Sequence, residues 1–382
     1  MSKKTIYLDY AAATPLDGEV FRVMQPYGAD FFYNPSAPYQ PAREVRGDIE
    51  SARSSVARIL GAKPTEIIFT AGATESINLA FTIGGHIVTS AVEHAAVISA
   101  ARQYDHSLVG VDKNGLIKLA ELEKLIRDET TLISVGLVNN ETGVVQPLGE
   151  IVKIIEKVRA KRAQKNKSTP LFLHTDASQA GGVLDLNVAR LGVDLLTLNG
   201  SKMYGPKQTG VLYVGSSISL HPIVHGGGQE RGLRSGTENV AGIIGFAKAF
   251  EIAQKKRKTE VERIHSLRQQ MIDLLQSEFD DILILNKPKH QAPHILTIAW
   301  RDLDAERALF ALETDNILVA TGSACAANKD SRSHVLVALG LKPDVIDGSL
   351  RLSFGRQTTS KEIAQAGKII SMIIKRELKR GK

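Results

Sequence analysis

Cysteine is almost absent from this chain, because Cys325 is the only one in 382 residues. A single cysteine excludes a disulfide within the chain. No window contains the uninterrupted apolar run that a membrane-spanning helix needs. The N-terminus, Met1 to Asp9, is too short and too polar for the core of a signal peptide. We therefore expect a cytoplasmic protein with no membrane contact, in which the free thiol stays reduced.

Aromatic residues are also scarce, at 5% of the sequence, and no stripe interleaves them with basic side chains. The net charge of +7 therefore does not indicate direct nucleic-acid binding. The densest basic runs, at residues 159–167, 255–258 and 375–382, lie at predicted helix ends, where solvated helix faces explain them. An acidic protein partner or an acidic substrate fits this charge equally well.

The first two thirds of the sequence alternate short β-branched runs with helical patterns. This rhythm predicts a mostly parallel sheet covered by helices on both faces, in a large domain over residues 16–255. Ligands of such folds gather beyond the carboxyl ends of the strands. The expected strands are 66–69, 86–89, 131–135, 171–174, 194–198 and 211–214.

The pattern changes after residue 240. A long helix with apolar positions such as Ile264, Leu267 and Met271 is expected to bridge two domains. Beyond Pro288, strands and helices alternate in a way typical of a smaller α+β domain, which we assign to residues 256–382, joined by the N-terminal segment 1–15. The expected elements there are strands at 294–298, 316–319 and 350–354, and helices near 303–313, 331–339 and 360–378.

Two residues that follow strands are candidates for covalent cofactor chemistry. Lys202 lies in a glycine-rich turn after one strand, where its amine could hold a carbonyl as a Schiff base, although most such lysines are only solvated. Asp176 follows another strand, where a carboxylate could face the ring nitrogen of pyridoxal phosphate or simply cap a helix. A metal site at His174 and Asp176 is a third interpretation, but no further His or Cys stands at ligand spacing, and we expect no metal.

Three other segments carry weaker signals. Residues 69–76 turn through small side chains into a helix whose N–H groups, with the Thr74 hydroxyl, suit a phosphate, although a simple capped helix has the same pattern. His94 follows a strand, where an imidazole could stack on a planar ring, shuttle protons or be an ordinary core histidine. Small residues surround Cys325, as expected for an accessible working thiol, although free cysteines are more often buried and inert.

Taken together in chain order, these segments resemble the class V aminotransferase family of pyridoxal phosphate enzymes, and within it the cysteine desulfurases of the NifS/IscS type. The resemblance runs nearly from end to end, and the stretch from Cys325 to Gly340 is similar to the longer active loop of that type. The matching segments are residues 7–15, 72–76, 138–143, 176–179, 202–207, 225–232, 234–239 and 322–325.

The resemblance implies the fold of the pyridoxal phosphate (PLP)-dependent transferases, called fold type I, with a mostly parallel seven-stranded sheet between helices and a smaller α+β domain. It also implies that Lys202 forms the Schiff base with the cofactor and that Asp176 pairs with the pyridine nitrogen. Gln179 would donate to the ring hydroxyl, and His94 would stack on the ring and move protons. The phosphate would be held by Thr74, Ser201 and, from a second subunit of a homodimer, Thr237, and Ala73 would also contact the cofactor.

For the substrate, the resemblance implies that Asn140 and Arg351 grip the carboxylate of L-cysteine, the arginine through its bidentate fork. The Cys325 thiolate would attack the substrate sulfur, become a persulfide and release L-alanine, and its loop would then swing outward. The persulfide sulfur would pass to acceptor proteins for iron–sulfur cluster assembly or tRNA thiolation.

Two departures and three alternatives accompany this interpretation. The family commonly has histidine and serine where this chain has Ser201 and Asn199, so we expect cofactor binding of altered strength. After Asn34 to Ser36 the sequence also departs from the family, which affects the expected geometry of the site entrance. The alternative functions are another class V aminotransferase, a selenocysteine lyase, or an inactive sulfur-transfer scaffold.

Overall fold

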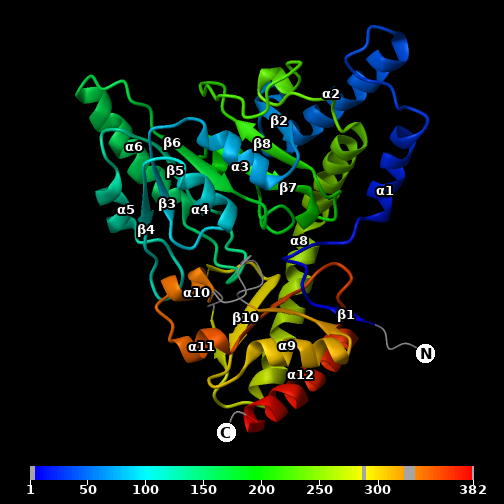
Figure 1. Cartoon of the computed structure of the whole chain (residues 1–382), viewed down its shortest axis with the longest axis vertical. Coiled ribbons are helices and arrows are strands. Elements are labelled where there is room, and N and C mark those ends of the chain that lie inside the picture. The colour runs from blue at the N-terminus through cyan, green and yellow to red at the C-terminus, as the bar shows by residue number, and fades with distance from the viewer. Residues whose placement is uncertain (1–4, 286–289, 322–331, 381–382) are drawn as a thin grey trace.

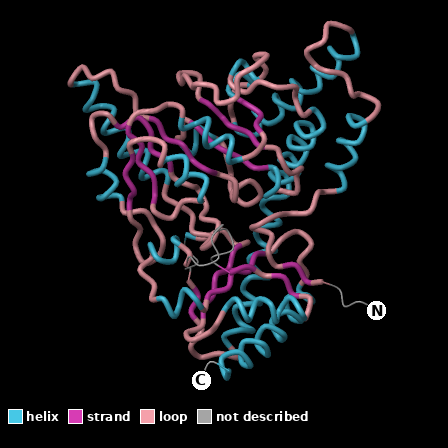
Figure 2. Tube along the Cα trace, in the orientation of Figure 1, coloured by secondary structure: helices cyan, strands magenta, loops and turns pink. Residues whose placement is uncertain are grey.

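The computed structural model describes residues 5–285, 290–321 and 332–380, which form two halves around separate cores (Figure 1). The upper half in the view holds a seven-stranded sheet with helices on both faces, and the lower half holds a four-stranded sheet (Figure 2). Within the described ranges, no helix is long and apolar enough to cross a bilayer.

The large sheet has the strand order β2-β8-β7-β6-β5-β3-β4. Strand β8 runs antiparallel to β2 and β7, and the other neighbours pair in parallel, which confirms the predicted mostly parallel sheet. Its strands are β2 (Ile67–Thr70), β3 (His86–Ser90), β4 (His106–Val109), β5 (Thr130–Ser134), β6 (Phe172–Asp176), β7 (Leu195–Asn199) and β8 (Gly210–Val214).

Neighbouring apolar residues of these strands enter two different cores, because successive side chains of a strand point to opposite faces. Ile87 belongs to the cluster under α3 (Ala73–Phe81) and α4 (Ala95–Ala101). Val88 belongs to the cluster under α2 (Gln40–Leu60), α6 (Leu148–Gln164) and α8 (Val240–Gln276). Continuous apolar runs are therefore needed to bury both faces of the sheet. The other helices of this half are α1 (Gly18–Met24), α5 (Leu119–Leu125) and α7 (Val188–Leu191).

Helix α8 (Val240–Gln276) is 37 residues long and joins the two halves, as the sequence predicted. Asn239 caps its start by accepting a hydrogen bond from the N–H of Gly242. Residues such as Phe246 and Phe250 enter the core of the large half, whereas Leu267 and Met271 enter that of the small half. The domain boundary between residues 255 and 256 stays a prediction.

The small half has an antiparallel sheet of order β12-β13-β10-β9, and its strands β10 and β13 share a hydrophobic core with α9 and α12. The N-terminal segment also belongs to the small half. Strand β1 (Ile6–Tyr7) pairs with β11 in a separate two-stranded sheet, and Leu8 is fully buried in the core of this half. The elements are β9 (Leu283–Ile284), β10 (Ile295–Ala299), α9 (Ala305–Thr314), β11 (Ile317–Leu318), β12 (Ala320–Thr321), α10 (His334–Ala338), α11 (Pro343–Asp347), β13 (Ser349–Ser353) and α12 (Ser360–Arg380).

Candidate active site

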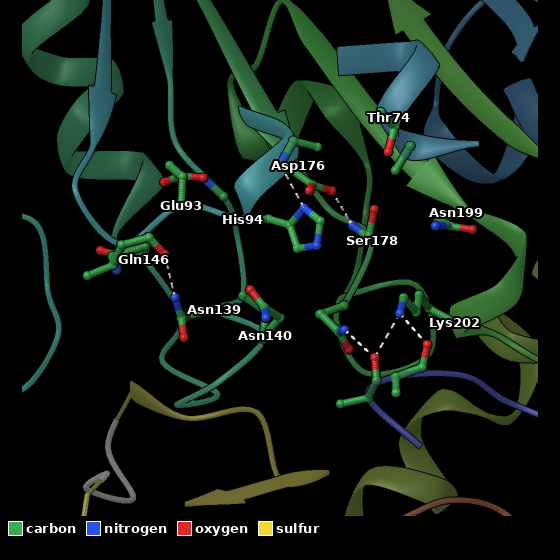
Figure 3. Close-up of a pocket in the computed structure, with 18 of the residues that line it drawn as sticks. Thr74, Glu93, His94, Asn139, Asn140, Gln146, Asp176, Ser178, Asn199 and Lys202 are labelled. Atoms are coloured by element: carbon green, nitrogen blue, oxygen red, sulfur yellow. Dashed lines mark hydrogen bonds between the residues drawn. The ribbon is translucent and has the colours of Figure 1, made fainter. Parts of the chain in front are cut away.

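A cavity of about 290 Å³ lies beyond the carboxyl ends of β3, β5, β6 and β7, where the large half faces β13 of the small half (Figure 3). Parallel strands bring their carboxyl ends to one edge of the sheet, which explains why residues distant in sequence meet here. Eight of the predicted site residues line this cavity: Ala73, Thr74, His94, Asn140, Asp176, Gln179, Lys202 and Arg351.

Lys202 is placed by the turn that follows β7. The strand ends at Asn199, and a short 3-10 helix (Gly200–Lys202) begins with the Asn199 side chain accepting a hydrogen bond from the N–H of Ser201 at 3.1 Å. A Cβ atom on Gly200 would lie 2.4 Å from the Thr209 hydroxyl, so the tight turn requires glycine there. The Lys202 amine donates to the carbonyls of Ala11 (2.9 Å) and Ala12 (2.5 Å), which hold it at the cavity floor.

Asp176 and His94 form the middle of the cavity (Figure 3). Asp176 is the last residue of β6, and its carboxylate accepts a hydrogen bond from the N–H of Ser178 at 2.9 Å. His94 caps α4, and its Nδ1 accepts from the N–H of Ala96 at 3.1 Å. An accepting Nδ1 carries no proton, so the neutral ring has its proton on Nε2.

The electrostatic surroundings also favour neutral His94. Burial lowers the pKa of its imidazole, and the nearby Lys202 and His334 lower it further, whereas the Asp176 carboxylate acts in the opposite direction. Burial is the largest of these causes. His94 therefore presents a neutral N–H donor to the cavity around neutral pH.

One end of the cavity is formed by the start of α3. Gly72 is the N-cap of this helix and has a φ of 138°, a conformation that favours glycine. Because glycine has no side chain to accept a capping hydrogen bond, the first N–H groups of the helix are directed out of its N-terminus. Thr74 lies in the first turn and also lines an adjoining open depression with Ser201, Asn199 and Lys207. Ser201 thus faces this depression, and its hydroxyl donates to the Asn199 side chain at 3.0 Å.

At the other end, Arg351 of β13 is buried between the two halves. Its guanidinium donates to the Asp9 carboxylate at 2.8 Å and to the carbonyl of Asn140 at 3.0 Å. Its Nε is buried and has no hydrogen-bond partner in the described part of the chain. The guanidinium therefore keeps donors for an anion beside Asn140.

Gln179 and Ser178 complete the wall near Lys202. The Gln179 amide donates to the carbonyl of Ala11 at 2.9 Å, so it shares an acceptor with the Lys202 amine. The Ser178 hydroxyl is buried without a partner among the residues described. An unpartnered buried hydroxyl in a cavity wall is a candidate contact for a bound molecule.

Three predicted residues are not among those that line this cavity, and the first of them, Ser201, lines the adjoining depression instead. Thr237 is exposed and lines a separate depression with Gln208 and Asn239, so its contribution from a second subunit stays a prediction. Cys325 and the loop predicted to swing outward lie outside the described residues.

The structure also adds residues that the sequence interpretation missed. Glu93 is buried in the cavity wall. The side-chain oxygen of Asn139 holds the turn that contains Asn140, because it accepts hydrogen bonds from the N–H groups of Glu141 (3.0 Å) and Thr142 (2.8 Å). The signals available in the sequence were the acid directly before His94 and the Asn139-Asn140 doublet. Neither pattern distinguishes a cavity wall from an ordinary turn.

His174 has a structural role that disfavours the metal interpretation. It is fully buried, and its ring nitrogens lie 2.8 Å from the Ser134 hydroxyl and 3.0 Å from the Thr197 hydroxyl. Burial lowers the pKa of the ring to about 3. A neutral histidine with both nitrogens bonded in the sheet does not face Asp176 as a metal ligand.

Comparison with known proteins identifies the family. The model of the family described as Aminotransferase class-V matches residues 6–365. The chain belongs to the class V aminotransferases. Among curated proteins, the cysteine desulfurase IscS of Dictyoglomus turgidum is 37% identical, over 98% of this chain and 95% of that protein.

Solved structures agree with this class V assignment. A NifS-like protein has a TM-score of 0.89 and 31% identity, over 97% of this chain and all of its own. SspA in complex with cysteine has a TM-score of 0.77 and 32% identity, over 92% of this chain and 99% of its own. Within the class V aminotransferases, the chain is a cysteine desulfurase of the NifS/IscS type, with the fold type I architecture predicted from its sequence.

Proposed function

We propose that this chain uses pyridoxal 5'-phosphate to remove sulfur from L-cysteine, giving L-alanine and a persulfide on Cys325. Sulfur passes from the substrate to the thiol, and the substrate carbon gains the hydrogen that completes alanine, so no external oxidant or reductant is needed. The observation that carries the proposal is the convergence of Lys202, Asp176 and His94 in one cavity.

The residues of this cavity fit the cofactor. Lys202 would hold it covalently, Asp176 would hold the ring-nitrogen proton, and the α3 N-terminus with Thr74 would bind the phosphate. The buried Ser178 hydroxyl has no partner in the described chain, as expected for a contact that a ligand completes. When bound, the cofactor supplies an electron sink that weakens bonds at the substrate carbons.

The protein residues supply orientation and protons. The Ala11 and Ala12 carbonyls direct the Lys202 amine, and the Gln179 amide is fixed at the same Ala11 carbonyl. His94 offers its Nε2 proton to the cavity, because the Ala96 N–H occupies Nδ1. Preorganised donors of this kind lose little free energy to reorganisation during the reaction.

Substrate binding is assigned to the opposite end of the cavity. Arg351 would bind the L-cysteine carboxylate beside the Asn140 amide. The two donors of this fork would be its Nε, which has no partner in the described chain, and the second N–H of one of its terminal nitrogens. The structure of SspA with cysteine supports an amino acid of this kind as substrate. A fixed carboxylate would orient the rest of the substrate relative to Lys202.

The wider role is also part of the proposal. We expect a cytoplasmic homodimer in which Thr237 of one subunit reaches the phosphate in the other. The persulfide sulfur would pass to an acceptor protein for iron–sulfur cluster assembly or tRNA thiolation.

The decisive experiment compares the wild type with Cys325→Ser in the holoenzyme. We expect the variant to lose alanine formation from cysteine and to retain the cofactor on Lys202, located by borohydride reduction and peptide mass spectrometry. Undiminished alanine production would overturn the role of Cys325 as the sulfur acceptor, whereas transfer of the amino group to a keto acid without formation of alanine would indicate another class V aminotransferase. Selective turnover of selenocysteine would indicate a selenocysteine lyase, and a wild type without a modified Lys202 would indicate an inactive scaffold.

A further inference from the structure

The first turn of α10, in the small half, is bonded to the wall of the cavity in the large half. The Ser333 hydroxyl donates to the Glu141 carboxylate at 2.5 Å, and the next residue, His334, donates from Nε2 to the carbonyl of Glu93 at 2.9 Å. Glu141 directly follows Asn140, and Glu93 directly precedes His94. Two consecutive residues of the small half thus contact the immediate neighbours of two site residues.

Glu141 is bonded to more than one element of the small half. Its carbonyl accepts a hydrogen bond from the Thr297 hydroxyl of β10, and its carboxylate accepts from Ser333. The carbonyl of the adjacent Asn140 accepts from Arg351 of β13. The turn that carries Asn140 is therefore held by β10, β13 and the start of α10 together.

Burial makes these contacts specific. Glu141 is 5% exposed and Ser333 is 4% exposed, so solvent cannot replace the hydroxyl as a donor. Ser333 also accepts from the N–H of Leu336 at 3.2 Å, which caps α10. Val335 of the same helix packs against Val92, which seats the turn on the large half.

We propose that Glu141 is a positioning residue that holds Asn140 and Arg351 in the arrangement that binds the amino-acid carboxylate. The Ser333 hydroxyl fixes the side chain of Glu141, and the Thr297 hydroxyl fixes its backbone. This inference rests on the proposed function, because it concerns the carboxylate end of the same cavity.

The test measures L-alanine binding to the holoenzyme by calorimetry, because alanine has the same carboxylate and no thiol. We expect Ser333→Ala to weaken binding about tenfold, as for loss of a hydrogen bond to a charged group, and to raise the KM for cysteine similarly. Ser333→Thr keeps the hydroxyl and should restore binding. Thr297→Val removes the other bond to Glu141 with little change in volume and should weaken binding independently.

The matched control is Asp304→Ala. Asp304 is exposed in the small half and caps α9 by accepting from the N–H of Arg307 at 3.0 Å, so its loss tests helix capping away from the cavity. We expect alanine affinity within twofold of wild type for this variant. If folded Ser333→Ala and Thr297→Val both bind alanine with wild-type affinity, the inference about Glu141 is wrong and the proposed function is unaffected. A wild type that neither binds alanine nor forms it from cysteine would overturn the proposed function, and the inference with it.

Discussion

Both carboxylate oxygens of Glu93 lie within hydrogen-bonding distance of one donor, the N–H of Gly136, at 3.0 Å and 2.9 Å. Complete burial raises the pKa of this carboxyl to about 8, the negative charge of Asp176 adds to the rise, and the Gly136 N–H partly offsets it. Glu93 is therefore protonated in the folded protein at neutral pH.

The first prediction follows from this raised pKa. The ordinary value is 4.5, so the folded state binds more protons than the unfolded state between pH 4.5 and about 8. The contribution of Glu93 to stability is present below this window and is lost as pH rises through it, by at most about 1.4 kcal/mol per pH unit. Glu93→Gln should remove that slope in urea unfolding measured across the window. The exposed Glu156→Gln is the control, and an unchanged slope in Glu93→Gln would contradict the assignment.

The second prediction concerns the Arg351 guanidinium. Lysine cannot reproduce its fork, so Arg351→Lys should raise the KM for cysteine by about tenfold or more. Asp9→Asn keeps the fork but removes its charged partner, and it should have a smaller effect on KM. Steady-state kinetics of both variants would test this order, and an equal KM for Arg351→Lys and wild type would exclude carboxylate binding by Arg351.

The third prediction concerns the phosphate end of the cavity. The side-chain oxygen of Asn199 accepts hydrogen bonds from both the N–H and the hydroxyl of Ser201. The side-chain nitrogen of Asn199 can therefore donate to a phosphate. Asn199→Ala should weaken binding of pyridoxal phosphate to the apoprotein about tenfold. Binding of pyridoxal, which lacks the phosphate, should change little. Fluorescence titration separates the two, and equal losses for both ligands would show a general disruption of the turn.

The fourth prediction concerns a buried ion pair outside the cavity. Arg53 donates to both oxygens of Glu230 at 2.8 Å, and one of these oxygens also accepts from the N–H of Phe69. Arg53→Met leaves a buried carboxylate without its partner and should lower the unfolding free energy by about 3–5 kcal/mol. The double variant Arg53→Met with Glu230→Gln should be less destabilised than Arg53→Met alone. Guanidinium unfolding measures both, and additive losses would show that the pair does not interact.

The sequence was sufficient to predict the parallel sheet and the group around Lys202, Asp176 and His94. Each of these residues follows a strand of recognisable pattern, and parallel strands deliver their carboxyl ends to a common edge. The long helix α8 was predictable for the same kind of local reason, because its apolar residues follow helical spacing.

The contacts between the two halves could not be predicted in this way. The pairs Arg351 with Asp9 and Ser333 with Glu141 are 342 and 192 residues apart, and no periodic pattern marks their partners. The burial of Glu93 was equally hidden. Glu93 and His94 are consecutive residues of one turn, and both line the cavity. Side-chain direction in a turn depends on tertiary packing that sequence periodicity does not encode.

The pairing of β1 with β11 affects the order in which the molecule can assemble during translation. Ile6 and Leu8 leave the ribosome about 310 residues before their partners at Ile317 and Leu318. Until those partners emerge, this apolar N-terminal segment has no native site, and the large half can fold without it. Nascent chains stopped before residue 317 should therefore keep the segment accessible to chaperones, whereas complete chains should sequester it.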